Sequence, residues 1–306
     1  MLSRVANHIY WMARYLERAE NTARLIQVNT HLLLDLPRSV PLGWEPIVDI
    51  LSIRENFYAN YESADEKSVI RFMVTDPNNP GSIINSLAAA RENARIVREI
   101  IPSEAWEEIN NIHLQAKADG QSVLTRRHRF NCLNKIIKAN QTITGLVGGT
   151  MNRDDAYAFL RLGRHLERCD MTSRIIDVRS ASLLPQMADE HPAFENIQWI
   201  GVLKSLSAYQ MYRQEMRLRV NRTDVLEFLL KRHSFPRSIC HSVHQIKKCL
   251  EELPQSDAVC DQFEQLSTIV EKLDIHTLTQ ESLHHVIDEI QAGLMDIHLA
   301  VNKAYF

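Results

Sequence analysis

The sequence predicts an all-α protein, a multi-helix bundle, from two observations. Apolar residues recur with helical spacing through most of the 306 residues, which is the pattern of amphipathic helices. Glycine and proline number only nine and ten, too few for the closely spaced turns of a β-rich architecture. Hydrophobic residues make up 45% of the chain, so there is ample material for a core.

In the first half we expect one long helix followed by shorter ones. The long helix runs from Leu2 to about Leu36 and stops before Pro37, because a residue that precedes proline disfavours helical backbone. Asn79 or Ser82 can cap a helix that begins at residue 83. The shorter helices are expected at about 47–61, 63–74, 83–101, 103–118 and 123–146.

The second half repeats the first. Residues 14–28 return as residues 164–178 with eight of fifteen positions identical, and Pro80-Gly81-Ser82 returns as Pro236-Arg237-Ser238. Two repeats in one order at nearly one offset indicate a duplication. We predict two similar halves, 1–150 and 151–306, divided near Gly148-Gly149 and packed as one compact unit. The expected helices of the second half span about 154–183, 195–219, 223–232, 237–252, 256–273 and 279–304.

Charge and cysteine content exclude several classes of function. A net charge of −3 gives no general attraction to nucleic acid or to anionic membranes. No apolar run reaches the ~18–20 residues of a membrane-spanning helix, and the first residues lack the apolar core of a signal peptide. Five widely spaced cysteines predict reduced side chains rather than disulfides. The expected location is the cytoplasm.

Motifs for nucleotide, metal or nucleophile chemistry are missing. The sequence contains no GxxxxGK[ST], no GxGxxG and no G-x-S-x-G. One Glu-x-x-His, Glu281 to His284, falls short of the two copies and two further glutamates of a di-iron bundle. No cofactor and no metal are therefore predicted, and the chain is expected to have a binding or accessory role.

The repeated segment carries a charged helical face. At about 100° per residue, Tyr10, Trp11, Arg14, Glu17 and Arg18 share one side of the first long helix. Large aromatic residues on that side indicate that it is covered, so its charges must be paired internally. If the two long helices meet about a pseudo-two-fold axis, their Glu-Arg doublets face each other.

This face allows three interpretations. It could be a buried salt-bridge lattice that fixes the register of the bundle. It could be a pocket in which arginines hold an anionic group while a glutamate acts as general base on an amine, or it could bind a partner protein. The candidates are Glu17 and Glu167 for catalysis, with Arg14, Arg18, Arg24, Arg164, Arg168 and Arg174 for binding an anion.

Two further clusters belong to one half each. Arg91 and Arg95 share a helical side next to Glu92, as either an anion site or an exposed ion-paired face. Arg213 lies near Tyr209 and Tyr212, which suits stacking on a ligand or ordinary packing of tyrosines beside solvated arginines.

The chain resembles the alpha-E family, bacterial all-helical proteins with a Glu-Arg motif. The resemblance covers the whole chain and rests on several segments together. They are Leu2-Ser3-Arg4-Val5-Ala6-Asn7-His8-Ile9-Tyr10-Trp11-Met12-Ala13-Arg14-Tyr15-Leu16-Glu17-Arg18, Asn79-Pro80-Gly81-Ser82, Ala90-Arg91-Glu92-Asn93-Ala94-Arg95, Arg164 with Glu167-Arg168, and Phe235-Pro236-Arg237-Ser238.

The resemblance implies a partnership. Members of the family are encoded beside or fused to a circularly permuted ATP-grasp protein, often with a transglutaminase-like protease. It follows from the resemblance that this chain is a non-ATP-binding component of a peptide synthesis or modification system that forms amide bonds. Its charged faces would position the substrate or the ligase. The alternatives are an independent enzyme with Glu17 or Glu167 as base, and a structural scaffold.

Overall fold

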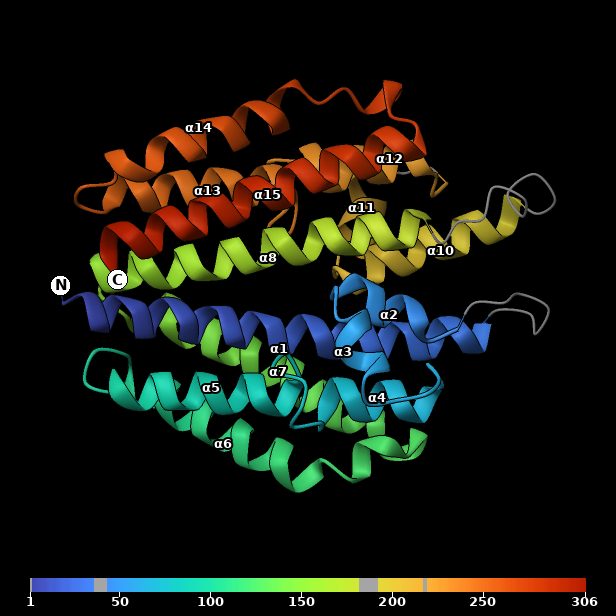
Figure 1. Cartoon of the computed structure of the whole chain (residues 1–306), viewed down its shortest axis with the longest axis horizontal. Coiled ribbons are helices and arrows are strands. Elements are labelled where there is room, and N and C mark those ends of the chain that lie inside the picture. The colour runs from blue at the N-terminus through green and yellow to red at the C-terminus, as the bar shows by residue number, and fades with distance from the viewer. Residues whose placement is uncertain (1, 36–42, 182–191, 217–218) are drawn as a thin grey trace.

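Two long helices lie side by side through the middle of the molecule (Figure 1). They are α1 (Ser3–Asp35) and α8 (Asp155–Ala181). The structure is a computed structural model that describes residues 2–35, 43–181, 192–216 and 219–306. All regular elements within these ranges are helical, which confirms the predicted all-α class.

Each long helix carries its own group of three helices. The helices α5 (Ile83–Ile96), α6 (Ser103–Asp119) and α7 (Arg126–Thr150) lie on the α1 side, whereas α13 (Ile239–Glu252), α14 (Asp257–Lys272) and α15 (Gln280–Tyr305) lie on the α8 side (Figure 1). In both groups the first and third helices pack directly on the long helix. The helix order is thus the same in the two halves, while the duplication itself stays a prediction.

Short elements join these groups. Two of them cross between the halves, since α2 (Glu45–Ile50) packs on α8 and α10 (Pro192–Ser205) packs on α1. The short elements are α2 (Glu45–Ile50), α3 (Arg54–Tyr58), α4 (Glu66–Val74), a 3-10 turn η1 (Ser122–Leu124), α10 (Pro192–Ser205), α11 (Tyr209–Met216), α12 (Arg222–Leu226), a π-helical turn η2 (Glu227–Lys231) and a 3-10 turn η3 (Ile275–Thr277).

Serine side chains cap the starts of α5 and α13. The Ser82 hydroxyl accepts a hydrogen bond from the Asn85 backbone N–H at the start of α5, and the Ser238 hydroxyl accepts one from the His241 backbone N–H at the start of α13. Each serine supplies an acceptor to an N–H group that has no partner within its helix. These are the serines of the repeated Pro-x-Ser segments.

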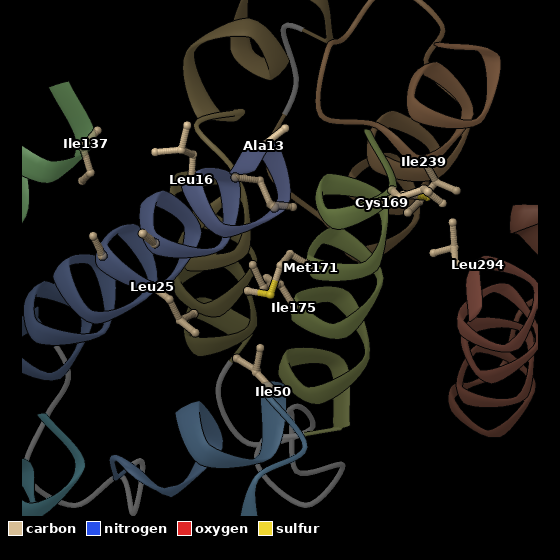
Figure 2. Packing of buried hydrophobic residues seen from close by; sticks show 14 of the residues in the cluster. Ala13, Leu16, Leu25, Ile50, Ile137, Cys169, Met171, Ile175, Ile239 and Leu294 are labelled. Atoms are coloured by element: carbon tan, nitrogen blue, oxygen red, sulfur yellow. The ribbon is translucent and has the colours of Figure 1, made fainter. Parts of the chain in front are cut away.

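The central helices meet over a continuous apolar core. Leu25 on α1, Ile50 on α2 and Ile175 on α8 converge between the helices (Figure 2) and are fully buried. At Gly163 the two backbones touch, because a Cβ there would lie 2.4 Å from the Tyr10 carbonyl oxygen. Glycine therefore permits the close crossing of α1 and α8.

Several predicted boundaries were wrong. The helix predicted at 195–219 is broken at Ser207 and the one at 47–61 at Ser52, where φ is +55° and +54°. The helix predicted at 83–101 ends at Ile96. Gly148 and Gly149 lie inside α7, so the chain turns after Thr150. Residues 36–37 and 182–183, where two predicted helices end, and residues 217–218, within the helix predicted at 195–219, lie outside the described residues.

No helix in the described part of the chain combines the length and the apolar character that crossing a membrane requires.

Candidate functional site

The two Glu-Arg doublets face each other where α1 and α8 pack. Arg168 donates from Nε and Nη2 to the two oxygens of Glu17, both at 2.9 Å. Arg18 donates in the same way to the two oxygens of Glu167, at 2.5 and 3.0 Å. Both pairs are therefore bidentate, the geometry in which arginine binds carboxylates most strongly.

Neighbouring charges extend these pairs into a cluster. Arg14 donates to Oε2 of Glu167 at 2.8 Å. One turn further along each long helix, Arg24 pairs with Glu20 and Arg174 pairs with Asp170, each through Nε at 2.9 Å. This i,i+4 spacing is the one that places two side chains together on a helix. The cluster is thus built from helix spacing within each half and from contact between the halves.

Arg237 belongs to the cluster, and the sequence analysis missed it as a site residue. From the turn before α13 it donates to Glu17 at 3.0 Å and to Glu20 at 2.8 Å. Its position in the repeat corresponds to Gly81. The sequence signal that could have identified it is the difference between the two Pro-x-Ser segments, because the second has arginine where the first has glycine.

Burial and neighbouring arginines set the charge of the two central glutamates. Glu17 is 4% exposed and Glu167 is 1% exposed. Burial raises the pKa of Glu167, but the charges of Arg18 and Arg14 outweigh it and hold the pKa at about 2. Burial likewise opposes ionisation of Glu17, whereas Arg168 and Arg237 hold its pKa well below the usual range.

This geometry bears on the predicted general base. The oxygens of Glu17 and Glu167 already accept hydrogen bonds from guanidinium groups, and a carboxylate with a depressed pKa is a weak proton acceptor. The arrangement favours a role for both glutamates in holding arginines over a role in proton transfer.

Within the described residues, the cluster contains more arginines than carboxylates. Four carboxylates, Glu17, Glu20, Glu167 and Asp170, accept from six arginines, namely Arg14, Arg18, Arg24, Arg168, Arg174 and Arg237. Arg164 lies against the same cluster and adds a seventh positive charge. The surplus of positive charge is favourable for an anionic group.

A hydrogen-bond chain connects the cluster to α15. Arg14 donates to the Tyr10 hydroxyl oxygen at 3.3 Å, and that hydroxyl lies 2.8 Å from Nδ1 of His298. Since arginine can only donate, the Tyr10 hydroxyl oxygen is the acceptor of the Arg14 bond. Burial and the nearby Arg14 lower the pKa of His298 to about 4, and burial raises the pKa of Tyr10 to about 12. Both groups are therefore neutral at pH 7.

The other predicted arginines lie away from the cluster's carboxylates. On α5, Arg91 donates to Asn110 at 2.7 Å and Arg95 donates to Glu92 at 2.9 Å. Arg213 is exposed on α11, 6.0 Å from the centre of the Tyr209 ring. The structure thus brings together Arg14, Arg18, Arg24, Arg164, Arg168 and Arg174 with both glutamates, but not Arg91, Arg95 or Arg213.

No three or more His, Cys, Asp or Glu side chains in the described ranges are arranged to hold a metal. His284, of the single Glu-x-x-His, has Nδ1 at 2.8 Å from Asp177.

Fold and cluster together define a class, all-helical proteins whose two central helices are joined by reciprocal Glu-Arg pairs. The chain belongs to the Alpha-E family, described as a predicted alpha-helical domain with a conserved ER motif, which matches residues 1–306. The Glu17-Arg18 and Glu167-Arg168 doublets fit that description.

The chain is also similar to uncharacterized proteins of Mycobacterium bovis and of two strains of Mycobacterium tuberculosis, CDC 1551 and H37Rv. Each is 24% identical over 271 residues, which cover 83% of this chain and 30% of the relative. The match thus spans less than a third of each relative's length. No solved structure matches the chain significantly.

Proposed function

We propose that the protein is a non-ATP-binding component of an ATP-grasp-linked system that synthesises or modifies peptides by forming amide bonds. In this role the arginine-rich cluster between α1 and α8 positions a substrate or the ligase. The observation that carries the proposal is the surplus of arginines over carboxylates in that cluster.

The chemistry of such a system matches the charge of the cluster. ATP-grasp ligases activate a carboxylate as an acyl phosphate, which an amine then attacks. Both the carboxylate and the acyl phosphate are anions of the kind that guanidinium groups hold through paired hydrogen bonds. The sequence has no phosphate-binding glycine loop, so ATP would be bound by the partner. That partner is an ATP-grasp ligase-like protein, with a transglutaminase-like protease as a further component of the same cytoplasmic system.

A specific observation favours a scaffold as the second candidate. The reciprocal bidentate pairs occupy the oxygens of Glu17 and Glu167. Buried ion pairs of this kind can have a purely structural role, in which they fix the register of packed helices. A scaffold needs no ligand, so the two candidates differ in what the protein binds.

Affinity capture tests the proposal. The tagged chain is isolated from cells that produce it naturally, and the co-eluting proteins are identified by mass spectrometry. Recovery of an ATP-grasp protein in near-stoichiometric amount is the expected result, followed by ATP turnover when candidate acids and amines are added to the complex. The proposal would be refuted if the chain elutes with no ligase and does not change the ATP turnover of the purified ATP-grasp protein encoded beside it. The scaffold would then be the remaining candidate.

A further inference from the structure

A small hollow lies beside the cluster, between α1, α7 and α8. Apolar side chains such as Ile143 form part of its wall, and its polar lining includes Glu17, Glu20, Asn140 and Arg164. Its cavity volume is about 10 Å³, and the space beyond opens toward solvent. The base therefore has room for about one oxygen atom of a ligand, while the rest of that ligand would lie at the mouth.

Two polar groups in the lining lack partners among the described residues. Arg164 makes no ion pair or hydrogen bond with them. Its pKa is lowered, mainly by burial and to a smaller extent by the charge of Arg168. Asn140 is 3% exposed; its Nδ2 donates to the Ile136 carbonyl at 3.0 Å, but its Oδ1 accepts no hydrogen bond. The hollow thus offers guanidinium donors and one buried acceptor.

Among the described residues Arg164 has no ion-pair partner, because the repeats differ at the position of Gly81 and Arg237. Its counterpart in the repeat, Arg14, pairs with Glu167. The equivalent acceptor for Arg164 would be Glu17, but Arg168 and Arg237 occupy that carboxylate. Because the first half has glycine where the second has Arg237, no arginine competes with Arg14 in the same way. The added arginine therefore releases one guanidinium toward the hollow.

We propose that this hollow binds the carboxylate of an N-acylated amino acid, the group found at a peptide C-terminus. Arg164 donates to the carboxylate, and Asn140 Oδ1 accepts from the N–H one carbon away. Glu17 and Glu20 do not repel this anion, since Arg168, Arg24 and Arg237 pair with them. The inference rests on the proposed function, because it names the chemistry of the substrate that the cluster would hold.

Binding of small probes to the whole purified chain tests the inference. Saturation-transfer NMR compares N-acetylglycine with acetate, which lacks the N–H, with N-acetylglycinamide, which lacks the carboxylate, and with inorganic phosphate. N-acetylglycine is expected to bind most tightly, and a short peptide with a free C-terminus to compete with it. No binding of N-acetylglycine, equal binding of the amide, or tighter binding of phosphate would overturn the assignment.

Substitutions then locate the site. Arg164→Gln should weaken N-acetylglycine binding about tenfold or more without lowering the melting temperature, because no ion pair of Arg164 is lost. Its repeat counterpart provides the contrast, since Arg14→Gln breaks a pair with Glu167 and should lower the melting temperature. Arg98→Gln, on the exposed Arg98–Glu99 pair, should change neither property. Unchanged affinity in Arg164→Gln would overturn the inference.

The probe experiment and the ligase capture fail separately. Carboxylate binding uses this chain alone, so its loss leaves the capture result standing. A chain that binds N-acetylglycine but captures no ligase would instead retain the site and lose the proposed partnership.

Discussion

Replacing Glu167 by glutamine tests how strongly the cluster holds α1 to α8. The side chain keeps its shape but loses its charge, so Arg14 and Arg18 lose their carboxylate acceptor. The usual pKa of 4.5 falls to about 2 in the folded protein, which corresponds to roughly 3 kcal/mol at about 1.4 kcal/mol per pKa unit. Breaking a buried pair from one side costs about 3–5 kcal/mol in other proteins, so a loss of at least about 3 kcal/mol is expected.

Urea unfolding followed by circular dichroism measures this loss. With an m-value of about 3 kcal/mol/M, the midpoint should fall by about 1 M while m stays unchanged. The control is Glu92→Gln, whose carboxylate pairs with Arg95 on an exposed face and whose midpoint should stay at that of the wild type. Combining Glu167→Gln with Arg18→Met should cost less than the sum of the two. A Glu167→Gln midpoint equal to that of the control would refute the view that buried charge pairing joins the helices.

Three further predictions concern the same crossing. Because the pKa of Glu167 is lowered on folding, its stabilisation is complete above about pH 4.5 and lost as the pH falls toward about 2; urea midpoints across that range should decline less steeply in Glu167→Gln, and equal slopes would contradict the assignment. Gly163→Ala places a Cβ 2.4 Å from a carbonyl oxygen of the facing helix and should cost about 3 kcal/mol of folding free energy. Its control, Gly145→Ala, has no atom within 4 Å of the new Cβ and should stabilise α7 by up to about 1 kcal/mol. Calorimetry that ranks the two variants in the opposite order would show that α1 and α8 can move apart at little cost. Arg237→Gly restores the residue of the first half, so Arg164 should pair with the freed carboxylate and N-acetylglycine binding should weaken about tenfold; unchanged binding would mean that Arg237 does not control the hollow.

The sequence was sufficient for the fold class and for much of the cluster. Helical spacing placed Arg14, Glu17 and Arg18 on one side of their helix, and the repeat supplied matching residues on the other long helix. These features are periodic, so they can be recognised without knowing the tertiary structure. The contact between the two Glu-Arg doublets could be predicted only on the assumption that the two long helices pack against each other, because the sequence does not show how helices distant along the chain pack.

Features that occur once escaped the sequence analysis. Arg237 reaches Glu17 from a turn 220 residues away, and no local pattern reports such a contact. The breaks at Ser52 and Ser207 depend on positive φ values that serine adopts only when its surroundings impose them. Gly148 and Gly149 lie in the last turn of α7, so two adjacent glycines did not mark the boundary between the halves even though glycine has a low helix propensity.

The exchange of short helices between the halves has a consequence for folding. Since α2 packs on α8 and α10 packs on α1, neither half can complete its own core without the other. A chain cut after Thr150 should therefore yield two fragments that are poorly folded alone and regain structure when mixed. During synthesis on the ribosome, residues 1–150 would then remain incompletely folded until α8 and α10 have been synthesised. The whole bundle would fold late, in a single step.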